Sequence, residues 1–270
     1  MTDTRKITYS TYADKVWQRG LIHLAEWFTG RKKLQALYDS LQDQDLENTT
    51  FWAEALKRLN VNLDTQIAQL EKVPANQPLV VVANHPFGVV DGLVICHLVS
   101  LIRPNFKIVL NDVLCQDSRI EKHVLPIDFA PTRTAQKENL RTRNACIEEL
   151  NAGGTVIIFP AGGVSTSPSL GSTATDLDWK PFTQKLIDKS KASVLPMYFH
   201  GQNSFLFQLF SQFSLTLRIG MLVREVNNKR NSTLKIEIGE LIPFEDIEAI
   251  STPEARLEHL RQSVYNLRQP

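Results

Sequence analysis

The chain has 270 residues, 43% of them hydrophobic and 22% charged, which is enough apolar material to bury a sizeable core. These proportions exclude a disordered chain and a small disulfide-stabilised scaffold. The 30 Lys and Arg residues nearly balance the 29 Asp and Glu residues, leaving a net charge of +1. A dedicated nucleic-acid binder carries a basic excess, so we expect no nucleic-acid partner.

The cysteines and the hydropathy of the chain limit its class further. Cys96, Cys115 and Cys146 are odd in number, widely spaced and in no CxxC pattern. This predicts neither a disulfide framework nor a metal site, and it favours a reducing cytoplasm. The N-terminus lacks the apolar core of a secretory signal, and no later stretch supplies the roughly 20 apolar residues of a membrane span. We therefore expect no transmembrane helix.

The first sixty residues have the periodicity of helices. Between Tyr12 and Leu59 apolar residues recur at helical spacing, with breaks at Gly30 and over residues 43–50. This pattern predicts a helical N-terminal segment over residues 1–60, made of two or three helices.

From Pro78 onward, short β-branched runs alternate with helical stretches. Strands are predicted at Leu79–Ala83, Phe106–Leu110, Thr155–Phe159 and Val194–Phe199. Helices are predicted at Gly92–Leu101, Thr134–Leu150 and Phe182–Ile187. This alternation indicates an α/β domain, predicted over residues 61–270, whose ligand site lies in loops just beyond the strand ends.

His85 and Asp91 form the first candidate site. They follow the strand predicted at Leu79–Ala83 and are separated by five residues, among which Pro86 and Gly88 favour a tight turn. Such a turn can bring the carboxylate onto one imidazole nitrogen and leave the other nitrogen to remove a proton from a hydroxyl. The same spacing also arises by chance, and His85 is then an ordinary structural histidine.

A second candidate site is the loop after the strand predicted at Thr155–Phe159. Its small residues, in Phe159-Pro160-Ala161-Gly162-Gly163, leave backbone N–H groups free to approach an anion. The alternative is an ordinary glycine-rich turn. Basic residues near Arg133, and a later cluster of Arg224, Lys229 and Arg230, are expected on solvated surface.

Residues 204–213 predict an amphipathic helix with a large apolar face. Its polar stripe would comprise Ser204, Gln208, Ser211 and Gln212. Such a helix either packs into the core or lies in the headgroup region of a membrane. No GxSxG, GxxxxGK[ST], HExxH or GxGxxG motif occurs, which removes sequence support for the common hydrolase and nucleotide-binding classes.

Two motifs, NHPFGVVDG (Asn84–Gly92) and IIFPAGGVST (Ile157–Thr166), stand about seventy residues apart and both leave predicted strands. Together they resemble the first and third motif blocks of the glycerophospholipid and lysophospholipid acyltransferase superfamily. Further segments resemble the branch that carries a hemolysin label and is related to the acyltransferases that complete bacterial ornithine lipids. These segments are DLDWKPFTQKLI (Asp176–Ile187), VLPMYFHGQNSFLFQLF (Val194–Phe210) and REVNNKR (Arg224–Arg230). The similarity covers roughly Phe51 to Pro243.

The resemblance implies an acyltransferase-like fold, in which a mixed, mainly parallel sheet is flanked by helices. It implies a transferase that moves a fatty acyl group from acyl-CoA or acyl carrier protein, as co-substrate and without a cofactor, to the hydroxyl of a lyso-lipid. His85 would be the general base and Asp91 would orient it. The substrate-binding residues would be Asn84, Gly88, Arg133, Phe159, Pro160, Ala161, Gly162 and Gly163.

The acceptor in such a reaction resides in a bilayer. The resemblance therefore favours a peripheral protein on the cytoplasmic face of a membrane, with the 204–213 helix against the lipid surface.

The motifs depart from the superfamily pattern at two places. The superfamily usually has four residues between its His and Asp, whereas five separate His85 from Asp91. Its third block usually reads Phe-Pro-Glu-Gly-Thr-Arg, whereas here Ala161 replaces the acid and Gly163-Val164 replace Thr-Arg. The second change removes side chains associated with glycerol phosphate, which points to an acceptor other than lysophosphatidic acid.

Two other functions remain open from the sequence. A thioesterase or lipid acyl hydrolase could use the same His85–Asp91 pair to activate water. A non-enzymatic lipid-binding protein would need neither residue for chemistry.

Overall fold

The structure, a computed structural model, describes residues 31–42, 48–111, 119–128, 132–169, 171–213 and 215–268. Residues 1–30, which hold half of the predicted helical segment, lie outside the described residues, as does Cys115. The rest of that segment contains helices α2 (Arg31–Gln42) and α3 (Asn48–Leu59). Helix α3 packs against α4 (Val89–Ser100) beside the sheet, and the domain boundary at residue 60 stays a prediction.

A seven-stranded sheet forms the centre of the molecule, in the order β1-β7-β6-β2-β5-β3-β4. The strands are β1 (Asn62–Asp64), β2 (Leu79–Ala83), β3 (Phe106–Asn111), β4 (Val124–Ile127), β5 (Thr155–Ile158), β6 (Ser193–Phe199) and β7 (Thr233–Ile238). Strands β2 to β6 are parallel to one another, whereas β7 runs antiparallel to β6, and β1 pairs parallel with β7. The predicted mixed, mainly parallel sheet is confirmed.

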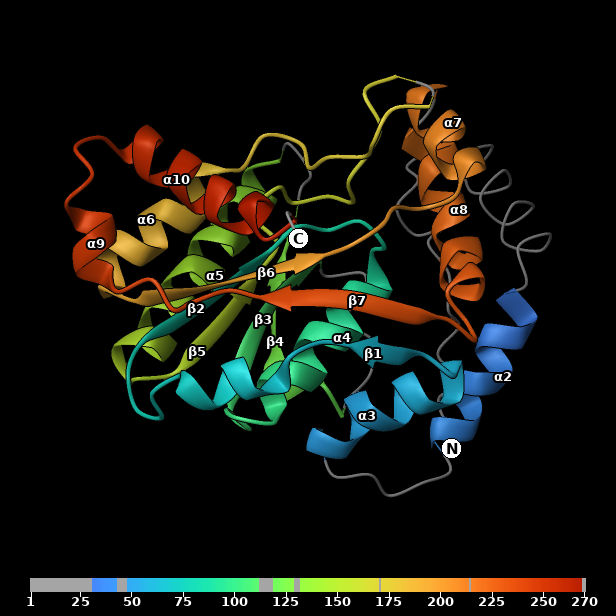
Figure 1. The fold of residues 1–270 in the computed structure, drawn as a ribbon, viewed down its shortest axis with the longest axis horizontal. Coiled ribbons are helices and arrows are strands. Elements are labelled where there is room, and N and C mark those ends of the chain that lie inside the picture. Colours follow the sequence, from blue (N-terminus) through green and yellow to red (C-terminus); the bar gives the residue numbers. More distant parts are fainter. Residues whose placement is uncertain are drawn as a thin grey trace.

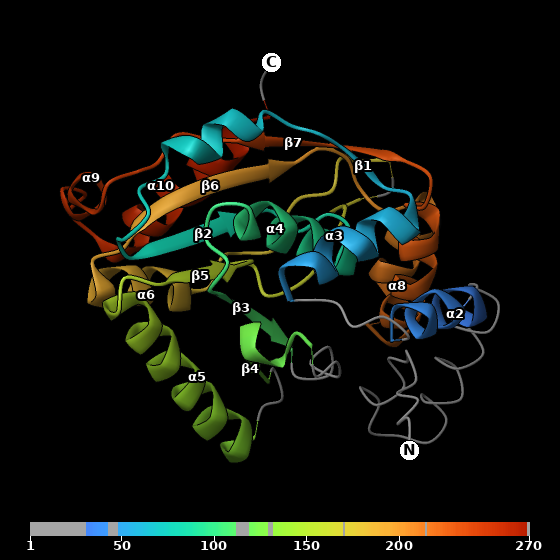
Figure 2. The same cartoon turned by 90° about the horizontal axis from the view of Figure 1, so that it is seen from below.

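Helices cover both faces of this sheet (Figures 1 and 2). Helices α3 and α4 lie on one face, and α5, α6 and α10 lie on the other. Helices α7 and α8 stand at the end of the molecule toward which β6 points. The further elements are α5 (Arg133–Asn151), α6 (Pro181–Ser190), α7 (Phe205–Phe213), α8 (Leu215–Asn228), α9 (Phe244–Glu248), α10 (Pro253–Asn266) and the 3₁₀ turns η2 (Ile67–Lys72) and η4 (Glu121–His123).

Strand β2 shows how the core is divided. All five of its side chains are fully buried, as expected for a central parallel strand that is covered on both faces. Leu79, Val81 and Ala83 belong to the apolar cluster on the α4 face, whereas Val80 and Val82 belong to the cluster with α5, α6 and α10. Continuing this alternation, His85 emerges on the α4 face, where Phe159 also packs.

Helix α4 begins at Val89, three residues before the predicted start at Gly92. Gly88 is its N-cap residue with φ of +78°, and the Asp91 side chain accepts the Gly88 N–H in the first turn. The left-handed backbone of Gly88 lets the chain turn directly from the β2 loop into the helix. Asp91 is therefore placed in the first turn of α4, close to the end of β2.

Candidate active site

Two loops, at the carboxyl ends of β2 and β5, build the candidate active site. Nδ1 of His85 lies 3.1 Å from Oδ2 of Asp91, and the side chains are 18% and 0% exposed. The distance suits a hydrogen bond, but Nδ1 makes none of acceptable angle here. Catalytic hydrogen bonds of ligand-free sites are often poorly aligned and tighten when substrate binds. The turn thus closes despite the five-residue spacing.

Asp91 is held by the backbone of the same turn. Its Oδ2 accepts the N–H of Phe87 at 2.8 Å and that of Gly88 at 3.0 Å. Burial raises the pKa of Asp91 above 3.8, whereas the hydrogen bond and charge of His85, followed by the two N–H groups, lower it. The carboxyl oxygen that faces His85 is therefore fixed by two backbone N–H groups.

The His85 ring stacks on Phe159, with ring centroids 4.0 Å apart and an angle of 25° between the planes. This contact restricts rotation of the ring without using either nitrogen. Among the described residues no group hydrogen-bonds to Nε2. The nitrogen opposite Asp91 is therefore available to a ligand.

Asp176 ties the two loops together, a role that the sequence did not indicate. Its Oδ1 accepts the backbone N–H of His85 at 3.1 Å and the Ser165 hydroxyl at 2.5 Å. Its Oδ2 accepts Nε1–H of Trp179 at 2.9 Å. The Ser165 N–H in turn donates to the His85 carbonyl at 2.8 Å. The similarity of the DLDW segment to the superfamily branch was the one signal that could have drawn attention to Asp176.

The side chain of Asn84 bonds to the end of β6, and its predicted contact with substrate stays a prediction. Its Nδ2 donates to the Phe199 carbonyl at 2.9 Å, and its Oδ1 accepts the Phe199 N–H at 2.7 Å. The side chain is buried. Since its amide already extends the pairing of β2 with β6, we assign Asn84 to holding the end of β2.

The glycine-rich loop offers fewer donors than predicted. The N–H of Gly162 donates to the Phe159 carbonyl at 3.0 Å, because Gly162 closes a tight turn with φ of +69°. The N–H of Gly163 has no partner among the described residues. Pro160 and Ala161 are buried, and the Pro160 carbonyl accepts the Lys180 N–H. Of the two predicted anion donors, only Gly163 is free to bind a ligand.

Arg133 is exposed at the first position of α5, where Thr132 caps the helix. Within the described ranges, no contact joins Arg133 to the loops that carry His85 and Asp91. Its predicted role in substrate binding has no support from a contact and stays a prediction.

Two basic residues from the C-terminal half of the chain lie beside these loops, Arg218 on α8 and Lys229 just after that helix. Lys229 was expected on solvated surface. Nη2 of Arg218 donates to the Val164 carbonyl at 2.6 Å. Nζ of Lys229 lies 4.0 Å from the Phe87 ring centroid and donates to the Gln202 carbonyl at 3.3 Å. Burial lowers the pKa of Lys229. The C-terminal half of the chain thus completes the surroundings of the β2 loop.

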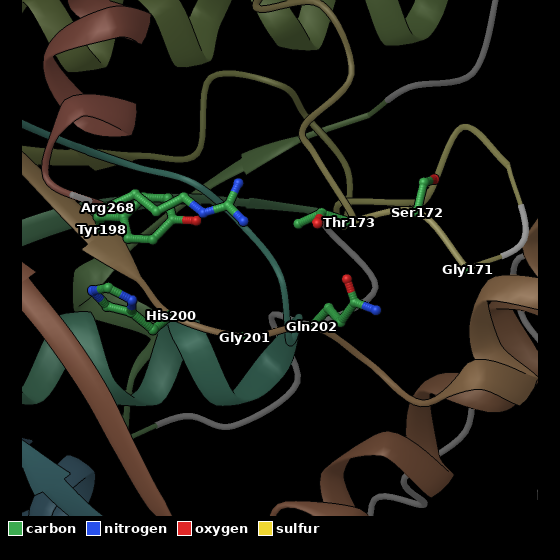
Figure 3. A pocket seen from close by; sticks show the side chains of 8 residues that line it. All are labelled: Gly171, Ser172, Thr173, Tyr198, His200, Gly201, Gln202 and Arg268. Carbon is green, nitrogen blue, oxygen red and sulfur yellow. The ribbon is translucent and has the colours of Figure 1, made fainter. Parts of the chain in front are cut away.

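A separate cavity of about 370 Å³ borders this loop (Figure 3). Tyr198, His200 and Arg268 line one side, and Ser172, Thr173 and Gln202 line the other. Neither His85 nor Asp91 lines it. It adjoins their loop through Gly201, because a Cβ on Gly201 would lie 2.9 Å from Cζ of Phe87. The cavity is therefore a polar neighbour of the site and not the site itself.

Residues 46–270 match the sequence profile of the acyltransferase family. The chain belongs to this family. Two curated relatives are lyso-glycine lipid O-acyltransferases. The protein from Phocaeicola vulgatus is 27% identical over 210 residues, which cover 75% of this chain and 72% of that protein. The protein from Bacteroides thetaiotaomicron is 26% identical over 210 residues, which cover 75% and 74%.

A solved structure shares the fold of this acyltransferase. The 1-acyl-sn-glycerophosphate (LPA) acyltransferase PlsC from Thermotoga maritima superposes with a TM-score of 0.54 at 16% identity, covering 97% of this chain and 92% of that one. The predicted acyltransferase-like fold is therefore confirmed. Within the described residues, no helix has the length and apolarity to span a membrane.

Proposed function

We propose that this acyltransferase moves a fatty acyl group from an acyl thioester to the hydroxyl of a lyso-lipid. The observation that carries the proposal is the 3.1 Å distance between Nδ1 of His85 and Oδ2 of the buried Asp91. The His85 side chain is still 18% exposed. Membership of the acyltransferase family supports acyl transfer. The two relatives named lyso-glycine lipid O-acyltransferase support a lyso-lipid as acceptor.

The proposed mechanism divides the two nitrogens of His85 between two tasks. The Asp91 carboxylate holds a proton on Nδ1, which leaves a lone pair on Nε2. Nε2 takes the proton of the acceptor hydroxyl while its oxygen attacks the thioester carbonyl carbon. The new C–O bond forms, the C–S bond breaks, and the departing thiolate receives the proton from Nε2. Asp91 stabilises the intervening imidazolium.

No acyl-enzyme is required in this scheme. The thioester is already activated, so alignment of the two substrates and removal of one proton suffice. Acyl-CoA and acyl carrier protein both present the same thioester, and either can serve as donor in this step. The Gly163 N–H is available to bind a substrate oxygen beside the dyad.

We further propose that α7 contacts the lipid surface, which would make the protein peripheral to a membrane. Phe205, Leu206 and Phe213 on this helix are 60%, 38% and 75% exposed. Gln208, a member of the predicted polar stripe, is buried, and its Oε1 accepts the Ser167 N–H at 2.9 Å. Large apolar side chains of α7 face outward, an arrangement typical of a lipid-contacting helix. A cytosolic thioester donor favours the cytoplasmic face.

The test is transfer by the purified protein in lipid vesicles. N-(3-hydroxypalmitoyl)glycine and palmitoyl-CoA or palmitoyl carrier protein are supplied, and the O-acylated product and free palmitate are measured by mass spectrometry. We expect the O-acylated product to appear only with acceptor present. Release of free palmitate at the same rate with and without acceptor would identify a thioesterase. If cells that carry His85→Gln have the same lipid composition as wild-type cells, a non-enzymatic lipid-binding protein would be favoured.

A further inference from the structure

Arg218 on α8 has a charge that the described residues do not neutralise. Its Nη2 donates to the Val164 carbonyl, and no carboxylate contacts its guanidinium within the described part of the chain. The side chain is half-buried, and burial lowers its pKa. A guanidinium carries five N–H donors, and removing it from water without an anion is unfavourable. The remaining donors can therefore bind an anionic ligand.

The position of Arg218 relative to the dyad follows from the face that α8 presents. Arg218 and Leu222 are four residues apart and lie on one face of the helix. Leu222 Cδ2 is 3.5 Å from the position that a Cβ would take on Gly88, whose N–H binds Asp91. This face of α8 therefore lies against the loop that holds the dyad.

The other end of the same face lies against the β5 loop. Nη2 of Arg218 is 3.4 Å from the position of a Cβ on Gly163. One residue beyond Val164, the Ser165 N–H binds the His85 carbonyl. The β5 loop itself has no basic residue between Phe159 and Thr166. Arg218 thus supplies, from a different part of the chain, a cation beside the free Gly163 N–H.

We propose that Arg218 binds the carboxylate of an acceptor whose headgroup is an N-acylated amino acid. The proposal rests on the lyso-lipid acyltransferase function argued above. An amino acid joined to a lipid through its nitrogen loses its ammonium charge and keeps one planar carboxylate. The planar guanidinium matches that group through two parallel hydrogen bonds. With the carboxylate at Arg218, the lipid hydroxyl is presented to Nε2 of His85.

The test compares one charged acceptor with its neutral analogue. N-(3-hydroxypalmitoyl)glycine and its methyl ester are assayed with wild type, Arg218→Gln, Arg218→Lys and the control Arg224→Gln. Arg224 lies six residues further along α8, roughly 120° around the helix axis. For the acid we expect Arg218→Gln to raise KM by about 10- to 100-fold with a smaller change in kcat. Arg218→Lys should fall between wild type and Arg218→Gln.

Comparison with the methyl ester distinguishes a loss of carboxylate binding from a general loss of active structure. Wild type and Arg218→Gln should use it equally poorly, and Arg224→Gln should match wild type on both acceptors. Equal losses on acid and ester, or no loss on either, would overturn the proposal. If Arg218→Gln does not fold, the acid-to-ester preference of Arg218→Lys decides in its place. A wild-type preference for lysophosphatidic acid over the acid would replace the carboxylate by a phosphate. Absence of transfer by wild type to every acceptor would overturn the proposed function itself.

Discussion

The imidazole of His85 lies nearly flat on the ring of Phe159, with the centroids 4.0 Å apart. His85 follows β2 and Phe159 follows β5, so this contact joins the two motif loops directly. Stacking fixes the ring plane through its face, with Nδ1 beside Asp91 and Nε2 without a hydrogen-bond partner among the described residues. The orientation of the proposed base therefore depends on both loops.

Replacement of His85 by Gln should remove the proposed base without removing the fold. Glutamine cannot accept a proton at neutral pH, so we expect kcat to fall by about 10²- to 10⁴-fold. His259→Gln is the matched control, because His259 is exposed on α10. Turnover of both variants and their melting temperatures check the prediction. A His85→Gln enzyme within threefold of wild type would show that the imidazole is not the base.

Replacement of Asp91 by Asn should remove the negative charge that stabilises the imidazolium of His85. The Asn oxygen can take the place of Oδ2, where it accepts the N–H groups of Phe87 and Gly88 and still faces Nδ1 of His85. Because the neutral amide no longer stabilises the positive charge that forms on His85 during proton transfer, we expect kcat to fall by about 10²-fold or more. Steady-state kinetics of the purified variant tests this, and retained turnover above a tenth of wild type would contradict it.

The same substitution should not destabilise the protein at neutral pH. Because the folded-state pKa of Asp91 is raised above 3.8, the folded protein holds this proton more tightly than the unfolded chain does. The ionised carboxylate therefore costs stability above the folded pKa, and this cost disappears as the pH falls through that pKa toward 3.8. Asp91→Asn should melt at the same or a higher temperature than wild type at pH 7, with a smaller difference in acid.

Denaturant unfolding at several pH values measures this difference. A loss of more than about 2 kcal/mol for Asp91→Asn at pH 7 would mean that the bonds of the carboxylate outweigh its burial. Reduced activity together with unchanged stability would instead separate the role of Asp91 in orienting His85 from any role in folding.

The parts of this site that were predictable from the sequence are local in the chain. Strand β2 was predicted with its observed bounds, and His85 and Asp91 were paired because both belong to one short turn. The residues that escaped prediction act across long separations. Asp176 binds the His85 N–H from 91 residues away, and Arg218 reaches the Val164 carbonyl from 54 residues away. No spacing rule for a single element reports such contacts.

Helix α7 shows why periodicity alone did not settle its orientation. Its polar stripe and apolar face were visible in the sequence, but the side that turns inward depends on its partner. Ser167 presents a buried N–H that needs an acceptor, and Gln208 supplies it. The helix consequently turns the side chains of Phe205 and Phe213 outward.

Two glycines of the first motif should respond to alanine in opposite ways. Gly88 has φ of +78°, and its Cβ would lie 3.2 Å from Val164 Cγ2. We expect Gly88→Ala to cost about 1–2 kcal/mol and to lower activity, because its N–H positions Asp91. Gly92 lies inside α4, and a Cβ added there would meet no neighbouring atom within 4 Å. Gly92→Ala should therefore stabilise the protein by about 0.5–1 kcal/mol.

Urea unfolding of the two glycine variants checks the signs, and activity assays check the link to Asp91. If both variants are destabilised by the same amount, the explanation is wrong. The loss in Gly88→Ala would then come from the added methyl group and not from the backbone conformation of Gly88.

Asp176→Ala should displace the backbone of His85 and so disturb the position of its side chain. The substitution leaves the His85 N–H, the Ser165 hydroxyl and Trp179 Nε1 without their acceptor. We expect a loss of about 2–4 kcal/mol in the free energy of unfolding, because buried donors without partners are costly. Turnover should fall as well, since the backbone of His85 loses its anchor. Asp176→Asn keeps one oxygen for His85 and Ser165 and should lose less.

The Trp179 bond can be isolated by a double-mutant cycle. Trp179→Phe removes the Nε1 donor, and Asp176→Asn removes the oxygen that accepts it. If the two groups interact as described, the double variant should be less destabilised than the sum of the single variants, by about 1 kcal/mol. Strict additivity would contradict the bond. Because His85 keeps its Oδ1 contact in both variants, turnover in this cycle should change far less than in Asp176→Ala.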